Sequence, residues 1–132
     1  MTGQAIEQEI QAKGLTAPRI TPSDIEENIQ SEHYFTAQDG VLGAYKNNDD
    51  VHQGSTTGHV SLRLLTFCVL VLENGFTVTG ESACASPENF DAEIGRKIAR
   101  QNAVQKIWPL MGYSLRSQLS AVTAYAQPKY PG

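Results

Sequence analysis

The sequence predicts an α+β fold, with a central antiparallel β-hairpin packed with a long helix of the C-terminal half and with shorter flanking helices. Residues 61–73 are rich in Leu, Val and Phe, as expected of a strand. Asn74-Gly75 follows, and this dipeptide favours a two-residue hairpin turn because both residues tolerate positive φ. A helical apolar period begins after residue 86. The 132 residues, of which 40% are hydrophobic, fit one globular domain.

Three segments are expected along the chain. Residues 1–20 form an N-terminal arm with a short helix over 4–13 that ends at Gly14. Residues 21–126 form the single α+β domain, and residues 127–132 a frayed tail. Thr21-Pro22 begins a second helix as N-cap and first helical residue, and its apolar stripe is Ile25, Ile29 and His33.

The region 38–60 reads as a long loop, with one short strand over 41–45. Its turn signals are the polar runs 47–50 and 53–58. A loop of this length in a small domain is often functional or disordered.

The predicted two-residue turn sets the hairpin register, with Glu73 opposite Phe76 and Val71 opposite Val78. It places Cys68 and Cys84 on opposite faces, so we expect two free thiols. The first strand is apolar on both faces, which is typical of a strand covered on both sides. One chain of this size offers few helices for that purpose, so we expect a homo-oligomer.

Ser86 and Pro87 predict the start of the next helix, and Pro109 its end. Lys97 is expected to pair with Glu93 one turn earlier. A separate last helix should follow Gly112. The expected buried face of the longer helix comprises Phe90, Ile94, Ile98, Val104 and Trp108, the last as a core anchor or, alternatively, a stacking surface for a base.

Charge is distributed unevenly along the chain. Residues 1–50 hold nine acidic and three basic side chains, whereas residues 94–132 hold six basic and no acidic ones. Either the two parts pack against each other, within a chain or between subunits, or the basic part binds an anionic ligand.

A candidate ligand site lies where the hairpin meets the helix. Small residues there allow close backbone approach, and the N–H groups of a helix start favour phosphate. Two readings stay open for this turn: an anion site, or a helix end already capped by Glu88 and Asp91. Glu81 either binds a ligand amine or hydroxyl, or forms a salt bridge to Arg96 or Arg100. The candidate ligand-binding residues are Thr79, Glu81, Ser82, Ser86, Asn89, Arg96 and Arg100.

Several classes of function are disfavoured. No run is long and apolar enough to cross a bilayer, and the N-terminus lacks signal-peptide character, which favours the cytoplasm. We expect no metal and no cofactor, because neither a Cys/His cluster nor a glycine-rich phosphate motif occurs. Cys84 reads as a buried thiol rather than a nucleophile because no partner base is identifiable, so no enzyme is expected. The net charge of −4 argues against binding of duplex nucleic acid.

Three stretches carry a resemblance: residues 14–22 (GLTAPRITP), 33–36 (HYFT) and the long run 62–109. They resemble a family of small tailed-phage proteins named after gene product forty-nine of one phage and gene product sixty-six of another. The resemblance implies a phage accessory protein, for host takeover or anti-defence, that acts in the host cytoplasm. By analogy with other small phage proteins, the expected function is non-enzymatic sequestration of a small anionic nucleotide-like ligand. The alternative is a protein-interaction module that inhibits a host protein.

Overall fold

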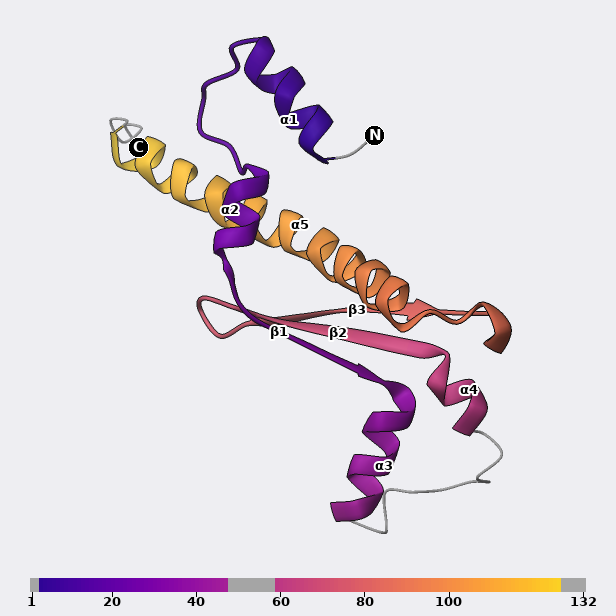
Figure 1. The fold of residues 1–132 in the computed structure, drawn as a ribbon. Helices are drawn as coiled ribbons and strands as arrows, with labels where there is room; N and C mark the ends of the chain where they lie inside the picture. Colours follow the sequence, from indigo (N-terminus) through magenta and orange to yellow (C-terminus); the bar gives the residue numbers. More distant parts are fainter. Residues whose placement is uncertain (1–2, 48–58, 127–132) are drawn as a thin grey trace. The chain divides into compact units, whose positions relative to one another are not determined.

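The computed structural model describes residues 3–47 and 59–126 (Figure 1). The chain divides into two units, 29–106 and 1–28 with 107–132, which are described separately. The predicted single domain over 21–126 stays a prediction. Most of the predicted turn signals within 47–58, and the predicted frayed tail, lie outside the described residues.

The unit 29–106 is built on a three-stranded antiparallel sheet, which confirms the α+β class and the central hairpin. The strands are β1 (Ile29–Thr36), β2 (Leu65–Leu72) and β3 (Thr77–Ala83), with β2 in the centre. β1 was not predicted. The expected helix from Thr21 ends early, as α2 (Pro22–Glu27), and the chain continues as a strand. Pairing of 29–36 with β2 overrides the i, i+4 spacing of Ile25, Ile29 and His33.

The hairpin is present, but its predicted register is wrong by one residue. Val71 lies opposite Thr77, and Leu70 opposite Val78. The reason is the turn: the N–H of Gly75 donates to Leu72 O at 2.9 Å and that of Leu72 to Phe76 O at 2.8 Å, which leaves a three-residue loop. Within the described residues only glycines have positive φ, and Gly75 has φ +87°. This is the hairpin loop in which a type I turn precedes a left-handed residue.

The corrected register places Cys68 and Cys84 on the same face, contrary to prediction. Both are nevertheless free thiols, as predicted. Gly80 lies opposite Cys68, and Cys84 lies four residues further along the chain, where its N–H donates to Leu64 O. Separation along the strand, rather than opposite orientation, therefore keeps the sulfurs apart.

Helix α5 (Ala92–Ala126) begins later and continues further than predicted. Asp91 caps it: its Oδ1 accepts from the N–H of Ile94 at 3.0 Å. Pro109 lies inside the helix instead of ending it, so the predicted separate last helix is the continuation of α5. A proline removes one backbone donor and clashes with one carbonyl, a local cost that need not stop the following residues from being helical.

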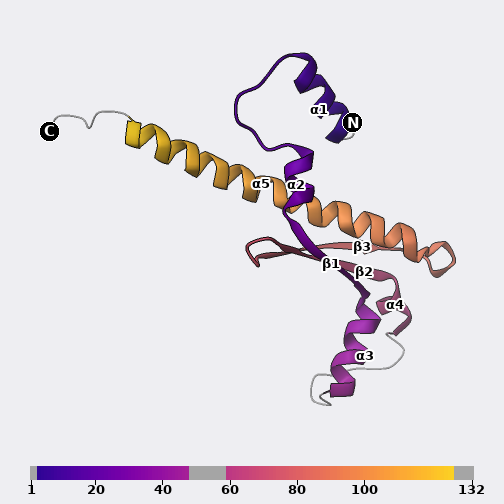
Figure 2. The ribbon, with the colours of Figure 1, turned by 60° about the vertical axis from the view of Figure 1, so that its left-hand side comes forward.

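Residues 92–106 of α5 lie along one face of the sheet in both views (Figures 1 and 2). The predicted buried side of this helix is wrong, because Ile94 and Ile98 are 54% and 42% exposed. Within residues 92–106 the buried residues are instead small, namely Gly95, Ala99 and Ala103, and the fully buried Ile107 follows them. A Cβ on Gly80 would come within 2.2 Å of Ala99 O and 2.3 Å of Ala103 N. The helix therefore approaches the strand too closely for larger side chains.

The predicted loop after residue 38 begins with a helix. α3 (Ala37–Asn47) replaces the expected short strand, and α4 (His59–Arg63) precedes β2. A capping box starts α3: Thr36 N donates to Asp39 Oδ2 at 2.9 Å, and Asp39 N donates to Thr36 Oγ1 at 3.1 Å. Both helices leave the sheet on the side away from α5 (Figures 1 and 2).

In the other unit, α1 (Gly3–Ala12) ends as predicted at Gly14. Gly14 has φ +67°, and Leu15 N donates back to Ile10 O at 3.3 Å, the pattern of a Schellman cap. The predicted N-cap Thr21 is confirmed, because its side chain accepts from Asp24 N. Ile25 of α2 is 1% exposed.

Candidate functional site

The turn between β3 and α5 does not form the predicted helix start at Ser86. Ser86 precedes a three-residue 3₁₀ helix, Pro87–Asn89, and makes no side-chain cap. Its hydroxyl donates to Glu88 Oε2, and this hydrogen bond lowers the pKa of the Glu88 carboxyl. The exposed side chains of Glu88 and Asp91 give the turn negative charge. So short a helix adds little dipole to oppose that charge.

The seven candidate residues lie in different places. Thr79 and Glu81 are exposed on β3, opposite Val69 and Phe67. Ser82, opposite Thr66, belongs to the face that α5 covers, whereas Ser86 and Asn89 belong to the turn. Because Glu81 points to the side of the sheet away from α5, the alternative of a salt bridge from Glu81 to Arg96 or Arg100 does not hold. The carbonyl of Glu81 accepts from Asn102 Nδ2 at 2.8 Å.

Arg100 is engaged within the fold. Its Nε donates to Glu32 Oε1 at 2.5 Å, and the hydroxyl of Tyr34 donates to the same oxygen at 2.9 Å. Partial burial raises the pKa of Glu32, but the hydrogen bonds from Arg100 and Tyr34 outweigh it and leave that pKa below its ordinary value. Burial, and then the Glu32 carboxylate, raises the pKa of Tyr34. Burial raises the pKa of Cys68, opposite Tyr34 on β2. Arg100 thus ties α5 to the edge strand β1.

Arg96, one helical turn earlier, is exposed, and the structure gives it no ion pair with any residue of 3–47 or 59–126. It lines a cavity of about 90 Å³ between β1, β2, α3 and the start of α5. The cavity combines hydroxyl groups, one carboxylate, one guanidinium and aromatic rings. The lining residues are Tyr34, Phe35, Thr36, Asp39, Thr66, Phe90, Ala92 and Arg96.

This cavity has the chemistry to hold one small anionic group. Arg96 offers paired N–H donors, which match phosphate or carboxylate. The carboxylate of Asp39, which would repel an anion, accepts the backbone N–H of Thr36 in the α3 cap. Its volume lies below the 300–1,000 Å³ usual for a whole small-molecule ligand, so most of a nucleotide would lie outside it.

The sequence does not predict most residues of this cavity. Tyr34 and Thr36 alternate with exposed residues along β1, and that strand was interpreted as helix. The available signal was the Thr36-x-x-Asp39 capping box, which predicts a helix start after residue 36.

The predicted ion pair between Lys97 and Glu93 is confirmed, with Lys97 Nζ and Glu93 Oε1 3.3 Å apart.

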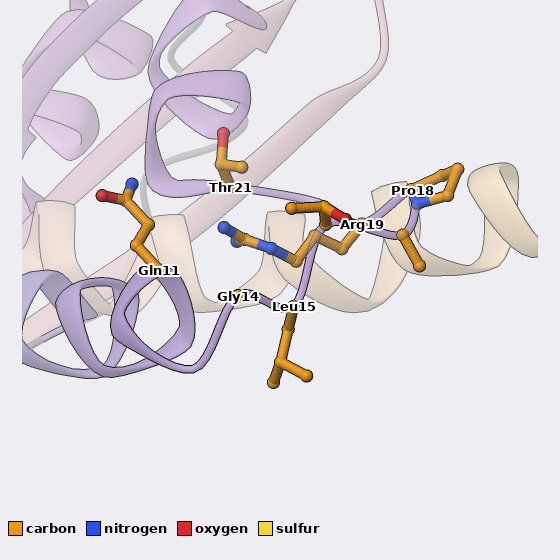
Figure 3. A pocket seen from close by; sticks show the side chains of 8 residues that line it. Gln11, Gly14, Leu15, Pro18, Arg19 and Thr21 are labelled. Atoms are coloured by element: carbon orange, nitrogen blue, oxygen red, sulfur yellow. The ribbon is translucent and has the colours of Figure 1, made fainter.

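A larger open pocket of about 540 Å³ lies in the unit that contains the N-terminus (Figure 3). Arg19 lines it with Gln11 and Thr21, whereas Leu15 points away from the Arg19 guanidinium. Two hydrogen bonds join Arg19 to Glu7: Nη1 to Oε2 at 2.7 Å and Nη2 to Oε1 at 2.5 Å. Glu7 therefore already neutralises the charge of Arg19, and Arg96 is the better candidate for an anion.

The expected absence of a metal and of a cofactor stays a prediction. The residues that the structure describes include no group of three or more His, Cys, Asp or Glu side chains that could hold a metal ion. Across 3–47 and 59–126, no helix combines the length and apolarity needed to cross a membrane.

These features define a small α+β protein with an arginine-lined cleft between helix and sheet. A family model described as the phage protein (N4 Gp49/phage Sf6 gene 66) family matches residues 20–119, and the chain belongs to this family. The predicted resemblance is thereby confirmed. No curated protein and no solved structure matches the chain.

Proposed function

We propose that this phage protein is an accessory protein that sequesters a small anionic nucleotide-like ligand in the host cytoplasm, as an anti-defence or host-takeover factor, without converting it chemically. Arg96 carries the proposal. It is the arginine of the helix–sheet cleft that has no partner among the described residues, whereas Arg100 is held by Glu32.

The cleft suits one phosphate of such a ligand. The Arg96 guanidinium would bind the phosphate, and Thr36 and Thr66 line the same cavity. The rings of Tyr34 and Phe90 line the cavity too, and aromatic rings are suited to stacking on a base.

The first experiment is a thermal-shift screen of the full chain against cyclic di- and trinucleotides and ADP-ribose derivatives. One of them should raise the melting temperature, because a ligand that binds only the folded state stabilises it. Recovery of that compound unchanged after long incubation supports sequestration. A chemically altered product would instead indicate an enzyme.

The second experiment measures affinity by titration calorimetry with the compound from the screen. Arg96→Ala should bind about tenfold to hundredfold more weakly, because a charge-assisted hydrogen bond contributes about 1.5–3 kcal/mol. Arg116→Ala, which removes another exposed arginine of α5, is the matched control and should bind like the unmodified chain. Equal affinity in both variants would contradict the assignment of Arg96.

Inhibition of a host protein is the second candidate, and α1 favours it. This helix has no buried residue, and Ile6 and the nearby Leu15 are largely exposed. Glu7 and Glu9 pair with Arg19 and Lys13, so the side chains that α1 offers a partner are the uncharged Ile6 and its glutamines. Two results together would support inhibition of a host protein. The chain would bind none of the screened compounds, and Ile6→Asp would abolish the effect of the chain on infected cells.

A further inference from the structure

Thr66 of the central strand β2 carries a buried hydroxyl group that has no partner. Its side chain is 3% exposed, and among the described residues no other polar side chain is buried. The main chain of Thr66 pairs with Thr36 on one side and Ser82 on the other, but its hydroxyl makes no hydrogen bond to any residue of 3–47 or 59–126. Buried polar groups are nearly always hydrogen-bonded, because an unpaired one costs free energy. This hydroxyl therefore calls for a partner from outside the chain.

The hydroxyl faces the first turn of helix α5. Thr66 Oγ1 lies 3.1 Å from the position that a Cβ on Gly95 would take, and Gly95 directly precedes Arg96. Thr66 and Arg96 line the same cavity of about 90 Å³, and Thr66 is the most deeply buried of the residues around it. A cavity of this size admits a group of several atoms rather than one water molecule alone. The two side chains are therefore placed to bind a single small group between them.

The charges around the cavity favour an anion. Ala92, the first residue of α5, lines the cavity, and the amino end of a helix carries partial positive charge. Arg96 adds a full positive charge. Among the described residues that line the cavity, Asp39 has the only carboxylate, and that carboxylate accepts the backbone N–H of Thr36 at 2.9 Å. The exposed Asp39 thus leaves the inner end of the cavity, at Thr66, without negative charge.

We propose that the Thr66 hydroxyl donates a hydrogen bond to one oxygen of a phosphate group whose other oxygens bind Arg96, so that the cavity selects phosphate over carboxylate. This role of Thr66 rests on the proposed anion binding at Arg96. A carboxylate that binds a guanidinium in the paired geometry turns both of its oxygens towards the arginine. A tetrahedral phosphate keeps further oxygens for a donor deeper in the cavity. Thr66 is thus a specificity-determining residue of the site.

The first test is a titration of the isotope-labelled full chain with inorganic phosphate and, at equal ionic strength, with acetate, followed by NMR. Phosphate should cause saturable shifts of the backbone amides of Thr66, Gly95 and Arg96. Acetate should bind about tenfold more weakly, because it leaves the Thr66 hydroxyl unpaired. Equal affinity for the two anions, or no saturable shift with phosphate, would overturn the proposal.

The second test is Thr66→Val, which replaces the hydroxyl by a methyl group. The affinity for inorganic phosphate should fall about tenfold, because one charge-assisted hydrogen bond is lost. Without phosphate, the urea concentration at the midpoint of unfolding should stay the same or rise, because an unpaired buried hydroxyl has been removed. Thr77→Val makes the same change at an exposed position of β3, on the side of the sheet away from α5, and should leave the affinity unchanged.

Two results with Thr66→Val would contradict the proposal. An unchanged affinity for phosphate would show that the hydroxyl does not contact the anion. A chain that unfolds at a lower urea concentration would show that the hydroxyl already has a partner within the fold.

The same variants separate this role of Thr66 from the proposed function. If inorganic phosphate binds through Thr66 but no screened nucleotide raises the melting temperature, the phosphate site stands and nucleotide sequestration is wrong. If a nucleotide loses affinity in Arg96→Ala but keeps it in Thr66→Val, the proposed function stands and the role of Thr66 is wrong.

Discussion

Gly80 shows most clearly how single residues set this fold. It lies on β3 directly under Ala99 and Ala103 of α5, and main-chain atoms occupy the space that a Cβ would need. Main-chain atoms cannot move aside as the end of a flexible side chain can. Helix and strand would have to separate to admit even one methyl group.

Gly80→Ala should therefore destabilise the chain by about 3 kcal/mol, the upper end of overpacking costs. Urea unfolding followed by circular dichroism measures this change. Gly112→Ala is the matched control, because a Cβ at this exposed helical position meets nothing within 4 Å. It should be neutral or stabilising by up to about 1 kcal/mol, since alanine favours helix over glycine. Equal effects of both substitutions would contradict the close approach at Gly80.

Glu32 links the edge strand to the helix through an ion pair with Arg100. Its pKa lies below the ordinary value, so its stabilising effect is present above the unfolded-state pKa and is lost as the pH falls through the folded-state value. Glu32→Gln should cost about 1 kcal/mol at pH 7, a modest amount because the pair is partly exposed to solvent. At pH 3 the difference from the unmodified chain should shrink. Urea unfolding at both pH values gives the comparison, and a cost that grows towards acid would contradict the assigned pair.

At the scale of elements, α5 departs most from expectation. The apolar period of Ile94 and Ile98 predicted the buried side, but large side chains there would hold the helix away from the sheet. The stripe of Gly95, Ala99 and Ala103 lets the helix approach Gly80 instead. A stripe of small residues can contact a sheet closely, or it can simply be a side of the helix without large side chains. Apolar periodicity alone does not distinguish these two cases.

Pro109 provides a test of the continuity of α5. In the interior of a helix, proline is less favourable than alanine by about 3 kcal/mol. This cost is smaller where the helix geometry has adapted to the proline ring. Pro109→Ala should therefore raise the free energy of unfolding by about 1–3 kcal/mol, as measured by urea titration. Pro87→Ala, at the first position of the 3₁₀ helix, is the control and should change stability little. A destabilised Pro109→Ala chain would indicate that the helix is interrupted there.

Strands and caps with local signals were predictable, and long-range choices were not. Thr21 was identified as an N-cap and Gly14 as a helix stop, because both act on their own neighbours. β1 was missed because its pairing depends on β2, some thirty residues further along the chain. The hairpin register was wrong because Asn74-Gly75 fits both a two-residue and a three-residue loop.

At the scale of the whole chain, the two arginines predicted to bind a ligand have different surroundings. Arg96 and Arg100 were selected from the sequence as a pair on one helix flank, but only the structure distinguishes them. Glu32, on a strand that was interpreted as helix, takes Arg100 and leaves Arg96 beside the cavity. The turn residues Ser86 and Asn89 were selected for a helix start that lies instead at Asp91.

The central claim is that α5 packs on the sheet through the small residues Gly95, Ala99 and Ala103. Nuclear Overhauser contacts from the Gly80 α-protons test it most directly, in a sample labelled at alanine and isoleucine methyl groups. The account predicts strong contacts to the methyl groups of Ala99 and Ala103 and none to those of Ile94. Strong contacts from Gly80 to Ile94, with none to either alanine, would place the other side of α5 on the sheet and contradict the account.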